Sequence, residues 1–259
     1  MFCIIDEMEQ ATVHEIFASI QGEGPWVGER HIFVRLQGCD VQCRYCDTPA
    51  SVPSAEGAPG TEFARVQSSF GPSASFDRVP NPVSASLLSE LCSRLIIPGP
   101  SRPTLSLTGG EPLLQHEFLA VWLPVVKKHY RVYLETNGIR YEAMNLIAGL
   151  VDVVSMDFKL PSSTGLRPFW EEHERFLSSV GSADLFVKAV VTRDTKKDDI
   201  LTSARLIAGR DASIFLVLQP AGGSLCPDAK TLIDYQEAAL GILPFVRVIP
   251  QVHKMMKVP

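Results

Sequence analysis

The chain has 259 residues, of which 46% are hydrophobic and 20% are charged, so it can bury a large core without disulfides. Its net charge of −5 and the lack of a Lys/Arg run argue against nucleic-acid binding. No apolar run approaches the roughly 20 residues that span a bilayer, and the N-terminus is acidic where a secretion signal is basic. We therefore expect a single cytoplasmic domain over residues 1–259, with no membrane partner.

Short β-rich runs alternate with longer helical patterns along most of the chain. The first expected strand is Ile32–Arg35, and residues 51–82, rich in Pro, Gly, Ser and Ala, predict a loop-rich insertion. The later expected strands are Thr104–Thr108, Val132–Glu135, Val151–Ser155, Leu185–Val191, Phe215–Gln219 and Val246–Ile249. The expected helices are Leu113–Lys128, Arg167–Val180, Lys197–Ala208 and Asp228–Leu240. This βαβα order predicts an α/β fold whose parallel sheet closes fully or partly into a barrel.

Three of the six cysteines form a CxxxCxxC motif directly after the first strand: Cys39, Cys43 and Cys46. The other three are scattered along the chain: Cys3, Cys92 and Cys226. This is not the pattern of a secreted disulfide framework, and thiolates suit Fe–S clusters or zinc. Three cysteines leave one iron of a [4Fe–4S] cluster open, where S-adenosylmethionine (SAM) could bind and be cleaved reductively. A zinc loop completed by Cys3, a histidine or an acid is the alternative, because structural zinc needs four ligands.

The cysteine motif, with Tyr45 before its last cysteine, resembles that of the radical SAM superfamily. Residues 108–112, Thr-Gly-Gly-Glu-Pro, follow an apolar strand and are similar to the family's glycine-rich motif. The resemblance implies a partial, incomplete (β/α)6-type TIM-like barrel that binds SAM and one [4Fe–4S] cluster. It implies SAM contacts at Tyr45, Thr108, Gly109, Gly110, Glu111, Glu135, Asn137, Ser155, Lys159 and Gln219. Either Ser155 or Lys159 could instead be structural, since the segment around them differs from the family variants.

Both ends of the chain resemble the 7-carboxy-7-deazaguanine synthase family, and the resemblance covers nearly the whole chain. It rests on residues 15–24 (EIFASIQGEG), 33–39 (FVRLQGC) and 247–254 (RVIPQVHK). It implies conversion of 6-carboxy-5,6,7,8-tetrahydropterin to 7-carboxy-7-deazaguanine with loss of ammonia, in queuosine and deazapurine biosynthesis. It also leads us to expect a homodimer and an electron donor such as flavodoxin or ferredoxin.

A pterin substrate presents a donor-rich guanidine-like edge, a carbonyl and here a carboxylate, so its pocket needs acids, amides and one cation. Gln21, Glu23, Arg35 and His253 supply that set, and the planar fork of Arg35 can grip a carboxylate. The glycines beside Glu23 predict close backbone approach at that point. The resemblance adds Gly110 and the terminal carboxylate of Pro259 to the expected substrate contacts.

Thr48 follows the last cluster cysteine, and in the resembled family a threonine at this position ligates a magnesium ion that also binds substrate oxygens. A hydroxyl plus substrate oxygens and waters suits magnesium, although Thr48 could instead cap the next turn. Two other functions remain open from the residues alone. Another radical SAM enzyme, such as a glycyl-radical activase, would share the cysteine loop, Gly109, Gly110 and Glu135 but differ at its C-terminus. A zinc-binding interaction module would lack catalysis.

Overall fold

The structure, a computed structural model, describes residues 9–48, 62–69 and 74–258. The expected roles of Cys3 and Pro259 therefore lie outside the described residues. Strands of the described part form a ten-stranded sheet in the order β12-β11-β10-β9-β8-β7-β3-β2-β4-β5, and a second sheet pairs β1 (Gln10–Ala11) with β6 (Val83–Ser84). In sheet order, the ten strands are Val246–Val248, Phe215–Pro220, Asp184–Val191, Val153–Phe158, Arg131–Thr136, Thr104–Gly109, Arg30–Leu36, Val13–Ile20, Phe63–Gln67 and Phe76–Pro80.

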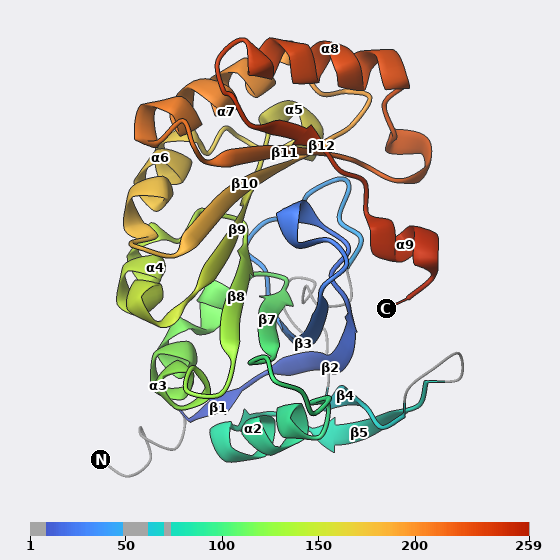
Figure 1. The fold of residues 1–259 in the computed structure, drawn as a ribbon, viewed down its shortest axis with the longest axis vertical. Coiled ribbons are helices and arrows are strands. Elements are labelled where there is room, and N and C mark those ends of the chain that lie inside the picture. Colours follow the sequence, from blue (N-terminus) through green and yellow to red (C-terminus); the bar gives the residue numbers. More distant parts are fainter. Residues whose placement is uncertain (1–8, 49–61, 70–73, 259) are drawn as a thin grey trace.

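In the part of the sheet that runs β3-β7-β8-β9-β10-β11-β12, every strand is parallel to its neighbours. The sheet curves around an interior but leaves β12 and β5 as separate edges, so it is an incomplete barrel (Figure 1). The antiparallel partner β2 and the β4–β5 hairpin extend it beyond β3. The expected partial α/β barrel is confirmed.

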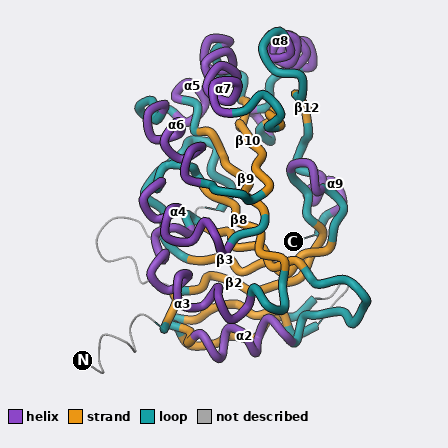
Figure 2. The backbone as a smooth tube through the Cα atoms, turned by 60° about the vertical axis from the view of Figure 1, so that its left-hand side comes forward, coloured by secondary structure: helices purple, strands orange, loops and turns teal. Residues whose placement is uncertain are grey.

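The helices lie mainly on the outer, convex face of the sheet (Figure 2). They are α2 (Ala85–Ser93), α3 (His116–Val126), α4 (Tyr141–Ile147), α5 (Pro161–Thr164), α6 (Trp170–Ser179), α7 (Lys197–Arg210), α8 (Ala229–Leu240) and α9 (Val252–Met256). Side-chain caps fix where two of them begin: Ser84 accepts a hydrogen bond from Leu87 N, and Asp228 from Thr231 N. None of the described helices has both the length and the apolar composition needed to cross a bilayer.

Strand alternation divides the interior of the protein into two regions. Outward side chains such as Leu105 and Leu107 are fully buried and belong to the main core with helix residues such as Trp122. Inward, a smaller apolar cluster of Tyr133, Val153, Phe186 and Val217 forms a floor. Nearer the carboxyl ends of the strands, the inward positions turn polar. Glu135 pairs with Ser155, and Asp157 with Lys188, in strand register. Thr108 at the end of β7 donates a hydrogen bond to Glu135. The fold thus places a polar site on an apolar floor.

All seven strands and four helices expected from sequence are present, with ends moved by a few residues. The interpretation of residues 51–82 as a loop was wrong in part, because β4 and β5 lie within them. Ala64 and Val66 on β4 are buried against the sheet. The alternation of these two small apolar side chains on β4 was too short to stand out among Ser, Gly and Pro. Strand β2 and helix α4 were also missed.

Candidate active site

One pocket gathers most of the residues expected to carry function. Its walls come from the cysteine loop after β3, the carboxyl ends of β7 to β11, the segment after β2 and helix α9. Expected site residues that line it are Gln21, Glu23, Arg35, Cys39, Cys43, Tyr45, Cys46, Thr48, Thr108, Gly109, Gly110, Glu135, Asn137, Ser155, Lys159, Gln219 and His253. Among the described residues of the expected set, only Glu111 does not line the pocket, because it is fully buried.

The three motif cysteines are free and turn toward this pocket, with Cys39 and Cys43 half-buried and Cys46 exposed. Burial raises the pKa of the Cys39 thiol to about 11 and also raises that of Cys43, so metal binding must displace their protons. In the described part of the chain, no three His, Cys, Asp or Glu side chains are grouped to hold one metal ion. A cluster takes each thiolate on a different iron, whereas a zinc ion needs its ligands to converge. Three soft thiolate donors that line one pocket fit the binding of an Fe–S cluster.

Gly109 and Gly110 are required by the cysteine loop itself. A Cβ at Gly109, whose φ is +144°, would lie 2.1 Å from Leu36 O, and one at Gly110 would lie 2.1 Å from Gly38 O. The close contact lets Glu111 N donate to Gly38 O at 2.7 Å. The sequence predicted a close backbone approach to SAM at these glycines. The structure reveals a close approach to the protein backbone, with both glycines still lining the pocket.

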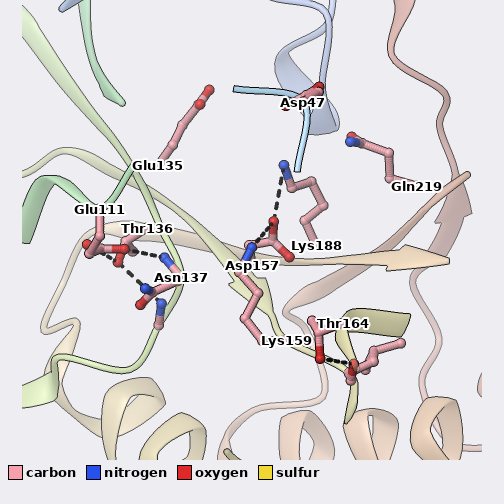
Figure 3. Close-up of polar contacts among 12 residues, drawn as sticks. Asp47, Glu111, Glu135, Thr136, Asn137, Asp157, Lys159, Thr164, Lys188 and Gln219 are labelled. Atoms are coloured by element: carbon pink, nitrogen blue, oxygen red, sulfur yellow. Dashed lines mark hydrogen bonds and ion pairs between the residues drawn. The ribbon is translucent and has the colours of Figure 1, made fainter. Parts of the chain in front are cut away.

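The Glu111 side chain lies beneath the pocket, fully buried, and binds protein donors. Its carboxylate accepts hydrogen bonds from Asn137 N at 2.7 Å and Thr136 Oγ1 at 2.9 Å (Figure 3), and a third from Leu113 N at 3.0 Å. Burial raises its pKa to about 7 despite these donors. The SAM contact that the resemblance assigns to Glu111 therefore differs from its place here, where it joins the loops after β7 and β8.

Glu135 links two groups of residues that the sequence treated separately. Its Oε2 accepts from Thr108 Oγ1 at 2.7 Å, and its Oε1 accepts from Gln21 Nε2 at 3.0 Å. Thr108 and Glu135 belong to the expected SAM contacts, whereas Gln21 belongs to the expected substrate contacts. The two expected subsites therefore share a wall.

Arg35 has a partner within the protein. Its Nε donates to Glu15 Oε1 at 2.8 Å, and its guanidinium lies over the Phe17 ring, 5.8 Å from the centroid. From the sequence, we expected the charge of Arg35 to be balanced by a bound ligand. In the structure, the carboxylate of Glu15 already balances it. Arg35 nevertheless lines the pocket.

Helix α9 closes the pocket through the Gln-Gly-Glu-Gly segment. Val252 N donates to Gly22 O at 2.9 Å, and a Cβ at Gly22 would lie 2.2 Å from His253 Nδ1. A Cβ at Gly24 would instead meet the Phe186 ring at 2.4 Å. The close approach at the glycines beside Glu23 is made by the protein itself, by His253 at Gly22 and Phe186 at Gly24, and substrate contact at Glu23 stays a prediction.

Lys188 and Asp157 are among the site residues that were not found from sequence. Lys188 Nζ lies 2.5 Å from Glu23 Oε2 and 3.6 Å from Asp157 Oδ2, and Lys159 Nζ lies 3.0 Å from the same Asp157 oxygen. Burial alone would raise the pKa of Glu23, but the Lys188 charge and hydrogen bonds from Lys188 and Gln251 hold it below its ordinary value. A lone lysine in the apolar strand Leu-Phe-Val-Lys-Ala-Val-Val was the available signal.

Comparison with known proteins agrees with this geometry. Residues 33–190 match the radical SAM superfamily, so the chain is a radical SAM protein, a class that works with a [4Fe–4S] cluster and SAM. It is 38% identical over 250 residues to 7-carboxy-7-deazaguanine synthase of Geobacter sulfurreducens, covering 95% of this chain and 97% of that protein. The corresponding enzyme of Methanopyrus kandleri is 36% identical over 247 residues, covering 94% and 92%. The chain belongs to the 7-carboxy-7-deazaguanine synthase family.

The same fold occurs in the crystal structure of QueE from Escherichia coli. The TM-score is 0.58 at 22% sequence identity, and the match covers 93% of this chain and 94% of that one. At this identity the likeness concerns the fold.

Proposed function

We propose that the protein converts 6-carboxy-5,6,7,8-tetrahydropterin to 7-carboxy-7-deazaguanine with loss of ammonia. The observation that carries the proposal is that Gln21, Glu23 and His253 meet the cysteine loop in one pocket, although they come from opposite ends of the chain. An activase acting on a protein would share the cysteine loop but has no need of this set. The pocket offers acid, amide and cation groups suited to a pterin.

In this proposal, Cys39, Cys43 and Cys46 hold the cluster. A bound [4Fe–4S] cluster with an open iron would supply the electron for reductive cleavage of SAM. Polar groups at the carboxyl ends of the neighbouring strands would bind SAM: Tyr45, Thr108, Gly109, Gly110, Glu135, Asn137, Ser155, Lys159 and Gln219. Glu111 would act beneath them by holding the Asn137 loop against the cysteine loop.

The substrate would lie against the wall formed by the Gln-Gly-Glu-Gly segment and α9. Glu23 is an anion in a buried position, which suits the guanidine-like edge of the pterin. Gln21 and His253 would orient the ring, and Arg35 would face the substrate carboxylate with its two terminal nitrogens. In the described part of the chain, no hydrogen bond from those nitrogens is present.

Thr48 is the proposed protein ligand of a magnesium ion. Its hydroxyl lies on the pocket wall, 3.2 Å from Asp47 Oδ1, and that carboxylate is engaged by Gln251 and Lys254. With Asp47 held in this way, the Thr48 hydroxyl would be the protein oxygen that holds the metal beside substrate oxygens, in keeping with the preference of magnesium for oxygen ligands. We further propose a single domain, a homodimeric assembly and a flavodoxin- or ferredoxin-like electron donor.

Anaerobic turnover tests the function directly. Protein reconstituted with iron and sulfide is incubated with SAM, magnesium, dithionite and the carboxytetrahydropterin, and mass spectrometry follows loss of ammonia from the pterin. A reconstituted protein with about four irons per chain that forms the deazaguanine supports the proposal. Cleavage of SAM with the pterin left unchanged would favour another radical SAM activity, and a colourless protein that takes up zinc would favour a binding module.

A further inference from the structure

Four charged side chains form a continuous line across the pocket: Glu23, Lys188, Asp157 and Lys159. Figure 3 shows Lys188 and Lys159 reaching the Asp157 carboxylate from two directions. Each of these side chains is at most 14% exposed, so solvent screens their interactions only weakly. A change in the partner of one therefore affects the others.

Glu23 is nearly saturated by donors from the protein. Lys188 binds its Oε2, while Gln251 Nε2 at 2.7 Å and Gln219 Nε2 at 3.2 Å bind its Oε1. An ionised carboxylate offers about four acceptor positions, so roughly one is left. A ligand edge with two N–H donors needs two positions. At least one of the present donors must leave before such an edge can bind.

Asp157 is placed to receive the donor that leaves. Its Oδ1 is buried and has no hydrogen-bond partner among the described residues, a condition that is costly for a carboxylate oxygen. Lys188 pairs with Asp157 in the register of β10 against β9, so both side chains project from neighbouring strands to the same side. The flexible stem of a lysine can carry its ammonium group the short distance between the two acids.

Resting on the proposed function, we propose that Lys188 is a positioning residue that exchanges partners when substrate binds. Lys188 pairs with Glu23 before substrate binds and moves to Asp157 when the guanidine-like edge of the pterin docks on Glu23. Lys188 thereby keeps an acidic partner throughout, and Glu23 stays ionised until the substrate arrives. A compound without paired N–H donors cannot displace Lys188, so the exchange also selects for the pterin edge.

A double-mutant cycle on substrate binding tests the exchange. The dissociation constant of the carboxytetrahydropterin is measured at saturating SAM for the reconstituted wild type, Lys188→Met, Asp157→Asn and the double variant. We expect Asp157→Asn to weaken binding about tenfold when Lys188 is present, because the displaced ammonium loses its second partner. In the Lys188→Met background the same change should alter binding by less than about twofold. Equal losses in the two backgrounds would overturn the exchange.

Lys159 provides the matched control, since it binds the same Asp157 oxygen and makes no contact with Glu23. In the Lys159→Met background, Asp157→Asn should keep its tenfold effect. If Lys159→Met abolishes that effect as fully as Lys188→Met does, Asp157 acts through overall charge balance and the exchange is wrong.

A second measurement needs only the single Asp157→Asn variant. A carboxytetrahydropterin analogue without the 2-amino group should bind wild type and Asp157→Asn equally, because it leaves Lys188 on Glu23. A tenfold loss with this analogue would contradict the exchange. Turnover by the wild type separates the two hypotheses. If the wild type does not convert the carboxytetrahydropterin, the proposed function is wrong. If it does convert the carboxytetrahydropterin but the binding losses of the single variants simply add in the double variant, only the exchange is wrong.

Discussion

Gln251 donates a hydrogen bond from Nε2 to Asp47 Oδ2 at 2.9 Å, across 204 residues of sequence. The same amide nitrogen donates to Glu23 at 2.7 Å, and Lys254 Nζ lies 2.8 Å from the Asp47 oxygen. These contacts hold the Asp47 carboxyl in its charged form, with a pKa below its usual range although burial opposes this. Gln251, the residue directly before α9, therefore ties the cysteine loop to the segment that carries Glu23.

Gly22→Ala should damage substrate binding selectively, because the new Cβ would overlap His253 and push α9 off the pocket. Overpacking of this kind costs about 1 kcal/mol or more, or roughly fivefold or more in KM. The measurement is KM for the pterin beside uncoupled SAM cleavage, which should persist. Gly149→Ala is the matched control, since no atom lies within 4 Å of its Cβ position. An unchanged KM in Gly22→Ala would contradict the docking role of α9.

Cys39→Ala, Cys43→Ala and Cys46→Ala should each abolish SAM cleavage, because two thiolates cannot hold the cluster with its open iron in place. Iron content and the yield of 5′-deoxyadenosine are the measurements. Cys226→Ala and Cys92→Ala serve as controls and should keep both the iron content and the yield of 5′-deoxyadenosine. Because Cys92 is buried, its replacement should lower the free energy of unfolding by about 1 kcal/mol. Iron loss in Cys226→Ala as complete as in Cys43→Ala would refute the three-ligand assignment.

Thr48→Ala should keep the cluster and SAM binding but raise the magnesium concentration needed for half-maximal turnover about tenfold or more. The reason is that only the protein oxygen proposed for the metal is removed. Thr48→Ser retains the hydroxyl and should behave as wild type. A magnesium titration that is the same in Thr48→Ala and Thr48→Ser would exclude this residue from the metal site.

Glu111 should make the cluster-free protein less stable as pH rises. Its folded pKa of about 7 exceeds the ordinary value of 4.5, so the folded state binds more protons between these pH values. The contribution is present below about pH 4.5 and is lost as pH rises through 7, a change of up to about 3 kcal/mol.

Urea unfolding of wild type and Glu111→Gln at several pH values measures this contribution. The gap in the free energy of unfolding between the two should depend on pH within that window, since the glutamine cannot titrate. A constant gap from pH 5 to 8 would show that Glu111 does not carry a raised pKa.

The sequence was most informative where chemistry is local. The spacing of Cys39, Cys43 and Cys46, and the glycine pair after β7, are contiguous motifs that indicated the cofactor site directly. The contacts of Glu23 were not predictable in this way, because its partners Lys188 and Gln251 lie 165 and 228 residues away. Strand register brings Lys188 opposite Asp157, and register is not visible in one strand alone. Likewise, Ala64 and Val66 became core residues only by pairing with β2.

The placement of α9 has a consequence for the order in which the site is completed during synthesis. Residues up to Asn137 already include the cysteine loop, the glycine pair and Glu135, so the expected ligands of the cluster are synthesised more than 100 residues before Gln251. The wall formed by Gln251 and His253 is translated later and packs back on Gly22. A nascent chain can thus carry its cofactor ligands long before it can recognise a substrate.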